Sequence, residues 1–264
     1  MTLMTFRTSA TVFSLTLPFL VVAQEFEPGY IDPEPVLRAA SASIGEDRLS
    51  CVSISGSAYT GMVGQQYINA YEIDWPRGKP LRNYSRIIDW ENIRMIETFD
   101  REPGHNPASW KYGLGWYSGT TVQKNERQIF SLNGNYAWHQ DGVGGVPRAA
   151  RPIDAERWQL DMWLTPHGFL KAARLPGANP VATWRWELGE MGRDGATVSP
   201  EKVTIVSITL MGKYRVDATI NSQNLLQRIH TWVPDPVLGD ANYEHEFSNS
   251  DYIDIGNGIR FPAV

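Results

Sequence analysis

The side chains of this sequence that could do chemistry are five histidines, one cysteine and a few closely spaced carboxylates. A dinuclear zinc site needs several His and Asp residues in one short loop, so that two metal ions share a nucleophilic water. No two histidines here lie within two residues of each other, and His245-Glu246 lacks the second histidine of a zincin pair. A Gly-x-Ser-x-Gly elbow is also absent. The sequence therefore predicts no metal site and no catalytic residue.

Two pairs of side chains are spaced like acid/base partners. His139 and Asp141 would share one face of a strand, although an Asp before Gly is more typical of a turn. Glu244 and Glu246 would also share a strand face, and acids at this spacing are more typical of a solubilising edge than of a glycosidase pair. We therefore expect structural roles for all four residues.

His167 and Cys51 are single candidates without a partner nearby in the sequence. His167 follows Pro166, so its ring is expected to bond a carbonyl that the proline frees, rather than to act in catalysis. Cys51 has no neighbouring His to form a nucleophilic pair and is expected to be a buried thiol in a strand.

The elements that must position these residues are mainly antiparallel strands. Residues 202–262 show consecutive β-rich runs with short polar connections, which favour a meander over parallel crossovers. Within Lys213–Ile220, apolar and polar residues alternate with period two, which predicts a sheet with one solvated face. Pro234 is expected to end a strand because proline cannot donate to a ladder. Further strands are predicted at Arg48–Tyr59, Tyr84–Phe99, Arg127–Gln140 (a hairpin turning at Asn133-Gly134), Val181–Leu188 and Ile253–Pro262.

Two helices are predicted from apolar stripes at helical spacing. The shorter one spans Val36–Ile44 and stops at Gly45. The longer one spans Ala155–Leu175, and Pro166 within it is expected to kink or divide it.

These elements predict an α+β fold, with a curved antiparallel sheet packed on one long kinked helix and a short N-terminal helix. By shape, such a sheet resembles the LolA/LppX-like half-barrels that hold acyl chains. An apolar concave face would bind a lipid or another apolar small molecule by removing its surface from water. Ordinary core packing is the alternative for each candidate lining residue, and these candidates are Trp163, Phe169, Leu170, Tyr214 and Trp232.

The first 23 residues have the features of a bacterial export signal. Arg7 precedes the mostly apolar stretch Ala10–Val22, and Val21-Val22-Ala23 fits the small-residue rule for cleavage. The stretch is interrupted and shorter than the ~20 apolar residues of a membrane span. We expect a single mature domain, residues 24–264, in the periplasm or secreted, without a transmembrane segment. The formal net charge of the whole 264-residue sequence is -5, which argues against a nucleic-acid partner.

Several segments resemble exported bacterial proteins that are described as metallo-β-lactamase-fold hydrolases. The segments are WLTPHGFLKAA (163–173), KYRV (213–216), TIN (219–221), TWVPDPVLGD (231–240) and, more weakly, GNYAW (134–138). In that family they belong to a non-catalytic region that precedes the catalytic domain. The resemblance implies that a His-x-His-x-Asp-His signature should follow, and this chain ends at Val264 before it.

The sequence leaves three functions open. The chain is expected to be a non-catalytic periplasmic domain that binds an apolar ligand or supports a hydrolase domain. The alternative is that the chain is the N-terminal portion of a zinc-dependent metallo-β-lactamase-fold hydrolase. In that case zinc would bind to a catalytic domain beyond Val264, and this chain itself is expected to bind no cofactor. A purely structural or partner-binding envelope protein is a third, weaker interpretation.

Overall fold

The computed structural model of this 264-residue chain describes residues 29–59, 80–101, 126–188, 200–235, 239–247 and 252–263. The predicted export signal, residues 1–23, lies outside the described residues.

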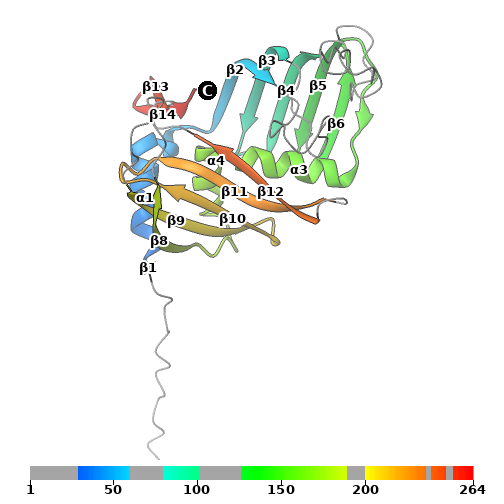
Figure 1. Ribbon diagram of the computed structural model, residues 1–264. Helices are drawn as coiled ribbons and strands as arrows, with labels where there is room; N and C mark the ends of the chain where they lie inside the picture. Colours follow the sequence, from blue (N-terminus) through cyan, green and yellow to red (C-terminus); the bar gives the residue numbers. More distant parts are fainter. Residues whose placement is uncertain are drawn as a thin grey trace, which may run out of the picture.

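Most of the described residues belong to two six-stranded antiparallel sheets (Figure 1). Sheet A has the strand order β1-β8-β9-β10-β11-β12, and sheet B has the order β2-β3-β4-β5-β6-β7. Sheet A consists of β1 (Tyr30–Ile31), β8 (Val181–Leu188), β9 (Pro200–Leu210), β10 (Tyr214–Ile220), β11 (Leu226–Asp235) and β12 (Gly239–Glu246). Sheet B consists of β2 (Cys51–Tyr59), β3 (Pro80–Asp89), β4 (Arg94–Arg101), β5 (Glu126–Asn133), β6 (Tyr136–Asp141) and β7 (Arg148–Ala149). The predicted α+β class and antiparallel pairing are confirmed, but the strands form two separate sheets rather than the single curved sheet expected from the sequence.

The helices lie between and beside the two sheets (Figure 1). Helix α3 (Pro152–Trp163) packs against β5 and β6 of sheet B, and α4 (Pro166–Ala172) packs against β11 of sheet A. Helix α1 (Pro33–Ile44) covers α4 and β8 and continues into the 3-10 turn η1 (Glu46–Arg48). The predicted stop of α1 at Gly45 is confirmed, since Gly45 adopts the left-handed conformation with φ +66°.

The segment predicted as one long kinked helix forms two helices. Helix α3 ends at Trp163, and Thr165 caps α4 by accepting a hydrogen bond on its side-chain oxygen from the Gly168 N–H at 3.2 Å. Pro166 occupies the first turn of α4, where its missing N–H costs nothing. The chain can therefore change direction between the two sheets without a buried, unpaired N–H at Pro166.

Gly168 at this junction leaves no room for a side chain. A Cβ there would lie 2.6 Å from Thr165 Oγ1 and 2.7 Å from the Met162 carbonyl oxygen. We predict that Gly168→Ala lowers the free energy of unfolding by about 1–3 kcal/mol, because the cap and the helix end must move apart. Urea unfolding would measure the loss. Gly144→Ala is the matched control with no expected loss, since a Cβ there meets nothing within 4 Å, and equal losses in the two variants would contradict the prediction.

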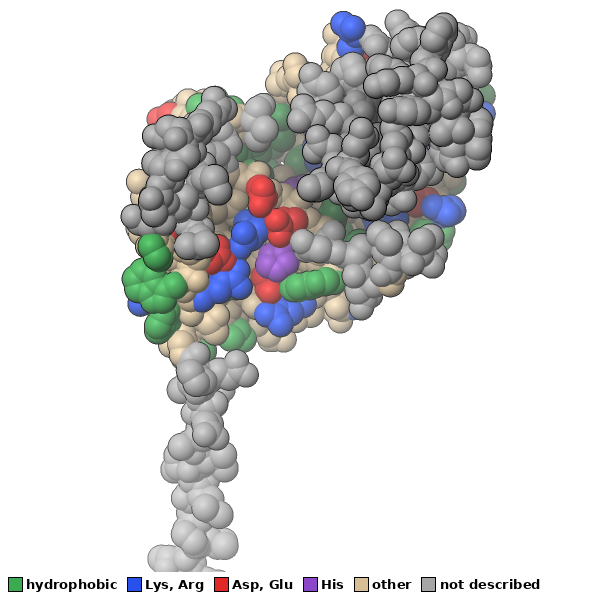
Figure 2. Space-filling model, viewed as in Figure 1, with side chains coloured by type: hydrophobic (Ala, Val, Ile, Leu, Met, Phe, Trp, Pro, Cys, Tyr) green, Lys and Arg blue, Asp and Glu red, His purple; other side chains and the backbone are tan. Residues whose placement is uncertain are grey.

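The polar face predicted for β10 is only partly solvated. Asp217 and Thr219 are 4% and 1% exposed, although they alternate with the buried apolar residues of the strand. Neighbouring side chains cover Asp217, with Arg215 Nε at 2.9 Å and His230 Nε2 at 3.8 Å from its carboxylate. Figure 2 shows the result on this face of sheet A, where basic and acidic side chains are interleaved. Period-two alternation therefore identified the strand, but ion pairs with neighbouring side chains bury part of its outer face.

Two further expectations about strands need correction. Pro234 does not end its strand, because β11 runs to Asp235 with Pro234 opposite Asp240 of β12. The ladder of β10 with β11 reaches only to Thr231, so Pro234 has an open side, which is where strands tolerate proline. Cys51 is exposed rather than buried, because strand alternation places Val52 and Ile54 against the core and Cys51 on the other face.

The end of the described chain forms a hairpin separate from both sheets. The predicted strand Ile253–Pro262 with its internal turn is a two-stranded unit, β13 (Tyr252–Gly256) and β14 (Ile259–Pro262). The Arg48 guanidinium anchors the turn by donating to the Asn257 and Gly258 carbonyls at 2.6 and 2.9 Å. In the described part of the chain, no helix is long and apolar enough to cross a membrane.

Candidate functional site

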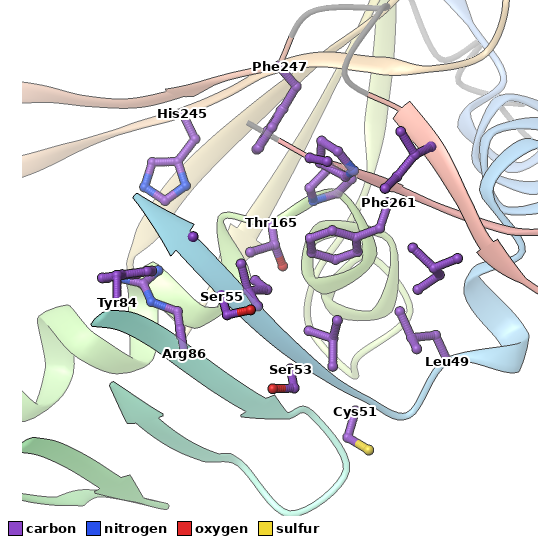
Figure 3. A pocket seen from close by; sticks show the side chains of 18 of the residues that line it. Leu49, Cys51, Ser53, Ser55, Tyr84, Arg86, Thr165, His245, Phe247 and Phe261 are labelled. Carbon is purple, nitrogen blue, oxygen red and sulfur yellow. The ribbon is translucent and has the colours of Figure 1, made fainter. Parts of the chain in front are cut away.

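A cavity of about 580 Å³ lies where the two sheets come closest to the hairpin (Figure 3). One wall is β2, the edge strand of sheet B, and another includes the end of β12, the edge strand of sheet A. The β13–β14 hairpin forms a third wall, and the junction between α3 and α4 adds Thr165 and Pro166. We call this cavity the cleft. Its volume falls within the ~300–1,000 Å³ typical of small-molecule sites.

The lining of the cleft is largely apolar. These apolar residues come from β2, from the helix junction and from the last described part of the chain: Leu49, Val52, Ile54, Pro166, Phe247, Ile253, Ile255, Phe261, Pro262 and Ala263. Ile253 and Ile255 remain 49% and 46% exposed. Large apolar side chains left half exposed beside a cavity are surface that a ligand could remove from water.

Buried charges stand at one end of the cleft. Arg86 of β3 bridges two carboxylates, with Nη2 2.9 Å from Glu97 Oε1 and Nη1 2.8 Å from Asp161 Oδ2. Asp161 Oδ1 accepts a hydrogen bond from the Tyr243 hydroxyl at 2.6 Å and lies 3.1 Å from His245 Nε2. This Arg86–Asp161 cluster joins β3 and β4 of sheet B to α3 and to β12 of sheet A.

The contacts within the Arg86–Asp161 cluster set its protonation. Burial alone would raise the pKa of Asp161, but the Arg86 charge and the hydrogen bonds from His245 and Tyr243 hold that pKa well below its usual range. Burial likewise opposes the charge of Arg86, yet Asp161 and Glu97 raise the pKa of the guanidinium above its ordinary value. The cluster is therefore a charged network at neutral pH, held between the two sheets.

Two tyrosines complete the network as neutral donors. The Tyr84 hydroxyl donates to Glu97 Oε1 at 2.7 Å, as the Tyr243 hydroxyl does to Asp161. Burial is the main cause that raises the pKa of each tyrosine far above its usual range. Both phenols therefore stay protonated and hold the carboxylates in place.

His167 lies behind the cleft and is fully buried. Its ring stacks between Trp90, at 6.1 Å between ring centroids, and the cleft residue Phe261, at 5.3 Å. Neither ring nitrogen makes a well-formed hydrogen bond with the described residues. Burial lowers the pKa of His167 to about 4, although the Ile44 carbonyl and Glu46 favour the charged ring. The expected bond to a freed carbonyl is therefore not formed with ordinary geometry, and His167 packs as a neutral ring.

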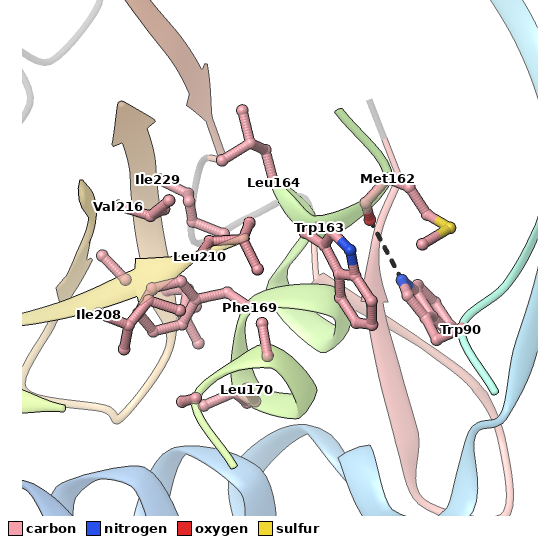
Figure 4. Close-up of a cluster of buried hydrophobic side chains, with 14 of the residues drawn as sticks. Trp90, Met162, Trp163, Leu164, Phe169, Leu170, Ile208, Leu210, Val216 and Ile229 are labelled. Carbon is pink, nitrogen blue, oxygen red and sulfur yellow. Dashed lines mark hydrogen bonds between the residues drawn. The ribbon is translucent and has the colours of Figure 1, made fainter. Parts of the chain in front are cut away.

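The five residues predicted to line a ligand site are not brought together. Trp163, Phe169 and Leu170 are at most 5% exposed and pack in the core with residues such as Ile208 and Leu210 (Figure 4). They do not belong to the lining of the cleft. Tyr214 and Trp232 line a different, smaller cavity of about 370 Å³ together with Lys213, Arg215 and Pro234. A ligand role for any of the five stays a prediction.

Of the other candidates from the sequence, Cys51 belongs to the lining of the cleft, whereas the two acid/base pairs do not. His139 stacks on Phe130 at 6.3 Å, and Asp141 lies 3.9 Å from Arg148. Glu244 and Glu246 are exposed on the edge strand β12, as expected for a solubilising edge. Among the described residues, no group of three or more His, Cys, Asp or Glu side chains is placed to hold a metal ion.

Sequence patterns alone did not find the residues of the Arg86–Asp161 cluster. Arg86, Asp161 and His245 are separated by more than seventy residues at each step and form no local motif. One signal was present, since Asp161 stands in an otherwise apolar stretch between Leu160 and Met162. A carboxylate in such a position requires a buried partner.

No family model, no curated protein and no solved structure matches this chain.

Proposed function

We propose that this chain is an exported, non-catalytic binding protein that holds an apolar small molecule, such as a lipid, in the cleft. The observation that carries the proposal is the pair Ile253 and Ile255, which line the cavity and remain about half exposed while most large apolar residues around them are buried. Covering such surface stabilises a complex by ~25 cal/mol per Å² of apolar area.

We propose that the cleft takes the place of the concave face of a half-barrel. In LolA/LppX-like proteins a curved sheet encloses the apolar ligand, and here the cavity opens between two sheet edges and the helix junction. We propose that sheets A and B together play the part of that curved sheet. The resemblance to the region that precedes a metallohydrolase domain leaves a supporting role for such a domain as a prediction.

Apolar fluorophore binding tests the proposal. Purified protein should enhance the fluorescence of N-phenyl-1-naphthylamine saturably, with one molecule bound per chain. Ser55→Trp places a large ring in the cleft, because Ser55 is an exposed residue of its β2 wall. We expect this variant to weaken binding at least about tenfold, which corresponds to ~1.4 kcal/mol.

Ala42→Trp is the matched control, since Ala42 is exposed on α1 and lies outside the cleft lining. It should bind the fluorophore as the wild type does. The proposal is rejected if the wild type shows no saturable binding, or if the two tryptophan variants bind with equal affinity.

A further inference from the structure

Three large polar side chains reach the cleft at one end of it. In Figure 3, Tyr84, Arg86 and His245 lie together, and Leu49 and Phe261 lie at the other end. We call these three residues the polar end of the cleft. A ligand that fills the cleft would therefore place one of its ends against apolar side chains and the other against the polar end.

The polar end offers hydrogen-bond donors. Only two of the five N–H groups of Arg86 are engaged by Glu97 and Asp161. The hydroxyls of Ser53, Ser55 and Ser57 belong to the β2 wall of the same cleft and can donate as well. The carboxylates Glu97 and Asp161 stand behind the wall and do not belong to the lining. Because a guanidinium can donate hydrogen bonds but cannot accept them, a ligand group that docks against Arg86 must accept.

The formal charge around the polar end disfavours an anion. One guanidinium faces two carboxylates, so the Arg86–Asp161 cluster carries one net negative charge when His245 is counted as neutral. The side chains of Glu97 and Asp161 are only 18% and 11% exposed, so water screens their charges weakly. An anionic group would gain hydrogen bonds from Arg86 but would also meet two nearby negative charges.

We propose that the natural ligand carries an uncharged hydrogen-bond acceptor, such as an ester or amide carbonyl, at one end of an apolar body. Its carbonyl oxygen accepts from the polar end, and its apolar body fills the rest of the cleft. This inference rests on the proposed binding function and adds the chemical class of the ligand. A carboxylate with the same chain binds less tightly because of the negative net charge beside Arg86.

Infrared spectroscopy of the wild-type protein gives the first test. Methyl dodecanoate labelled with ¹³C at its carbonyl is bound at one molecule per chain, and the labelled stretch is compared with that of the ester in hexane. We expect a shift to lower frequency, as hydrogen bonding to a carbonyl produces. A bound ester whose stretch stays at the hexane position would overturn this inference and leave the binding function standing.

A charge variant gives the second test. Glu97→Gln keeps an oxygen for Tyr84 and Arg86 and removes one negative charge behind the polar end. At pH 8, we expect the ratio of the dodecanoate Kd to the methyl dodecanoate Kd to fall about tenfold in this variant, because one repulsive charge is lost. Taking a ratio within one protein cancels the different hydrophobicity of the two probes.

Glu34→Gln is the control, since Glu34 is exposed in the first turn of α1, away from the cleft. Its ratio should equal that of the wild type. An unchanged ratio in Glu97→Gln would contradict the charge argument, provided its thermal unfolding shows a folded protein. If neither probe binds the wild type, the proposed function itself fails, and the two failures are therefore distinguishable.

Discussion

Replacing Asp161 with Asn should lower the free energy of unfolding by about 3–5 kcal/mol, because it breaks a buried ion pair and leaves Arg86 without one of its two counter-charges. The same change removes the charged acceptor of the Tyr243 hydroxyl and of His245. Sheet B, α3 and sheet A all lose a shared contact. Urea unfolding followed by tryptophan fluorescence at pH 7 would measure the loss.

Asp154→Asn is the matched control on the same helix. Asp154 pairs with Arg151 at 2.7 Å, but the Arg151 side chain is 77% exposed. Exposed pairs contribute little, so this variant should lose no more than ~1 kcal/mol. Similar losses at positions 154 and 161 would show that the Arg86–Asp161 cluster does not hold the layers together.

The second large effect is a loss of stability in weak acid caused by His167. Its pKa is about 4 in the folded protein and 6.5 in the unfolded chain, so between these values the unfolded chain binds the proton and the folded protein does not. The stability due to neutral His167 is complete above pH 6.5 and is lost as the pH falls toward 4. The lowered pKa of His167 corresponds to a loss of ~3 kcal/mol in the free energy of unfolding over this pH range.

His167→Phe isolates this effect. A phenyl ring can stack between Trp90 and Phe261 without the two unpaired ring nitrogens. The stability of the variant relative to the wild type should therefore rise by ~3 kcal/mol between pH 7 and pH 4, as measured by urea unfolding. Leu170→Val, a buried change on the same helix without a titratable group, should lower stability equally at both pH values. A pH-independent difference for His167→Phe would contradict the argument.

Local patterns in the sequence predicted most elements of the fold. Alternation located β10, the Asn133-Gly134 turn located the β5–β6 hairpin, and an apolar stripe with Gly45 located α1. Each of these signals depends on residues close in the chain. The division of the strands into two sheets depends on pairings such as β1 with β8, which lie about 150 residues apart and leave no local pattern.

The candidate site was harder to predict because it, too, depends on residues that are far apart in the chain. The aromatic residues expected to line it were chosen for size and apolarity, and core packing and ligand binding demand the same property. Phe169 packs in the hydrophobic core, whereas the smaller Ile253 and Ile255 are about half exposed beside the cleft. The Arg86–Asp161 cluster beside the cleft includes residues of β3, α3 and β12, and only the tertiary structure brings Arg86, Asp161 and His245 together.

Photolabelling tests the central claim, ligand binding in the cleft, most directly. Methyl dodecanoate with a diazirine at the end of its chain is bound to the wild-type protein, and the complex is irradiated. Mass spectrometry of the digested protein then identifies the labelled peptides. The label should appear in residues 49–57 and 252–263, which form the β2 and hairpin walls. Label at Tyr214, Trp232 and Pro234 around the smaller cavity, or label spread evenly over the surface, would contradict the account.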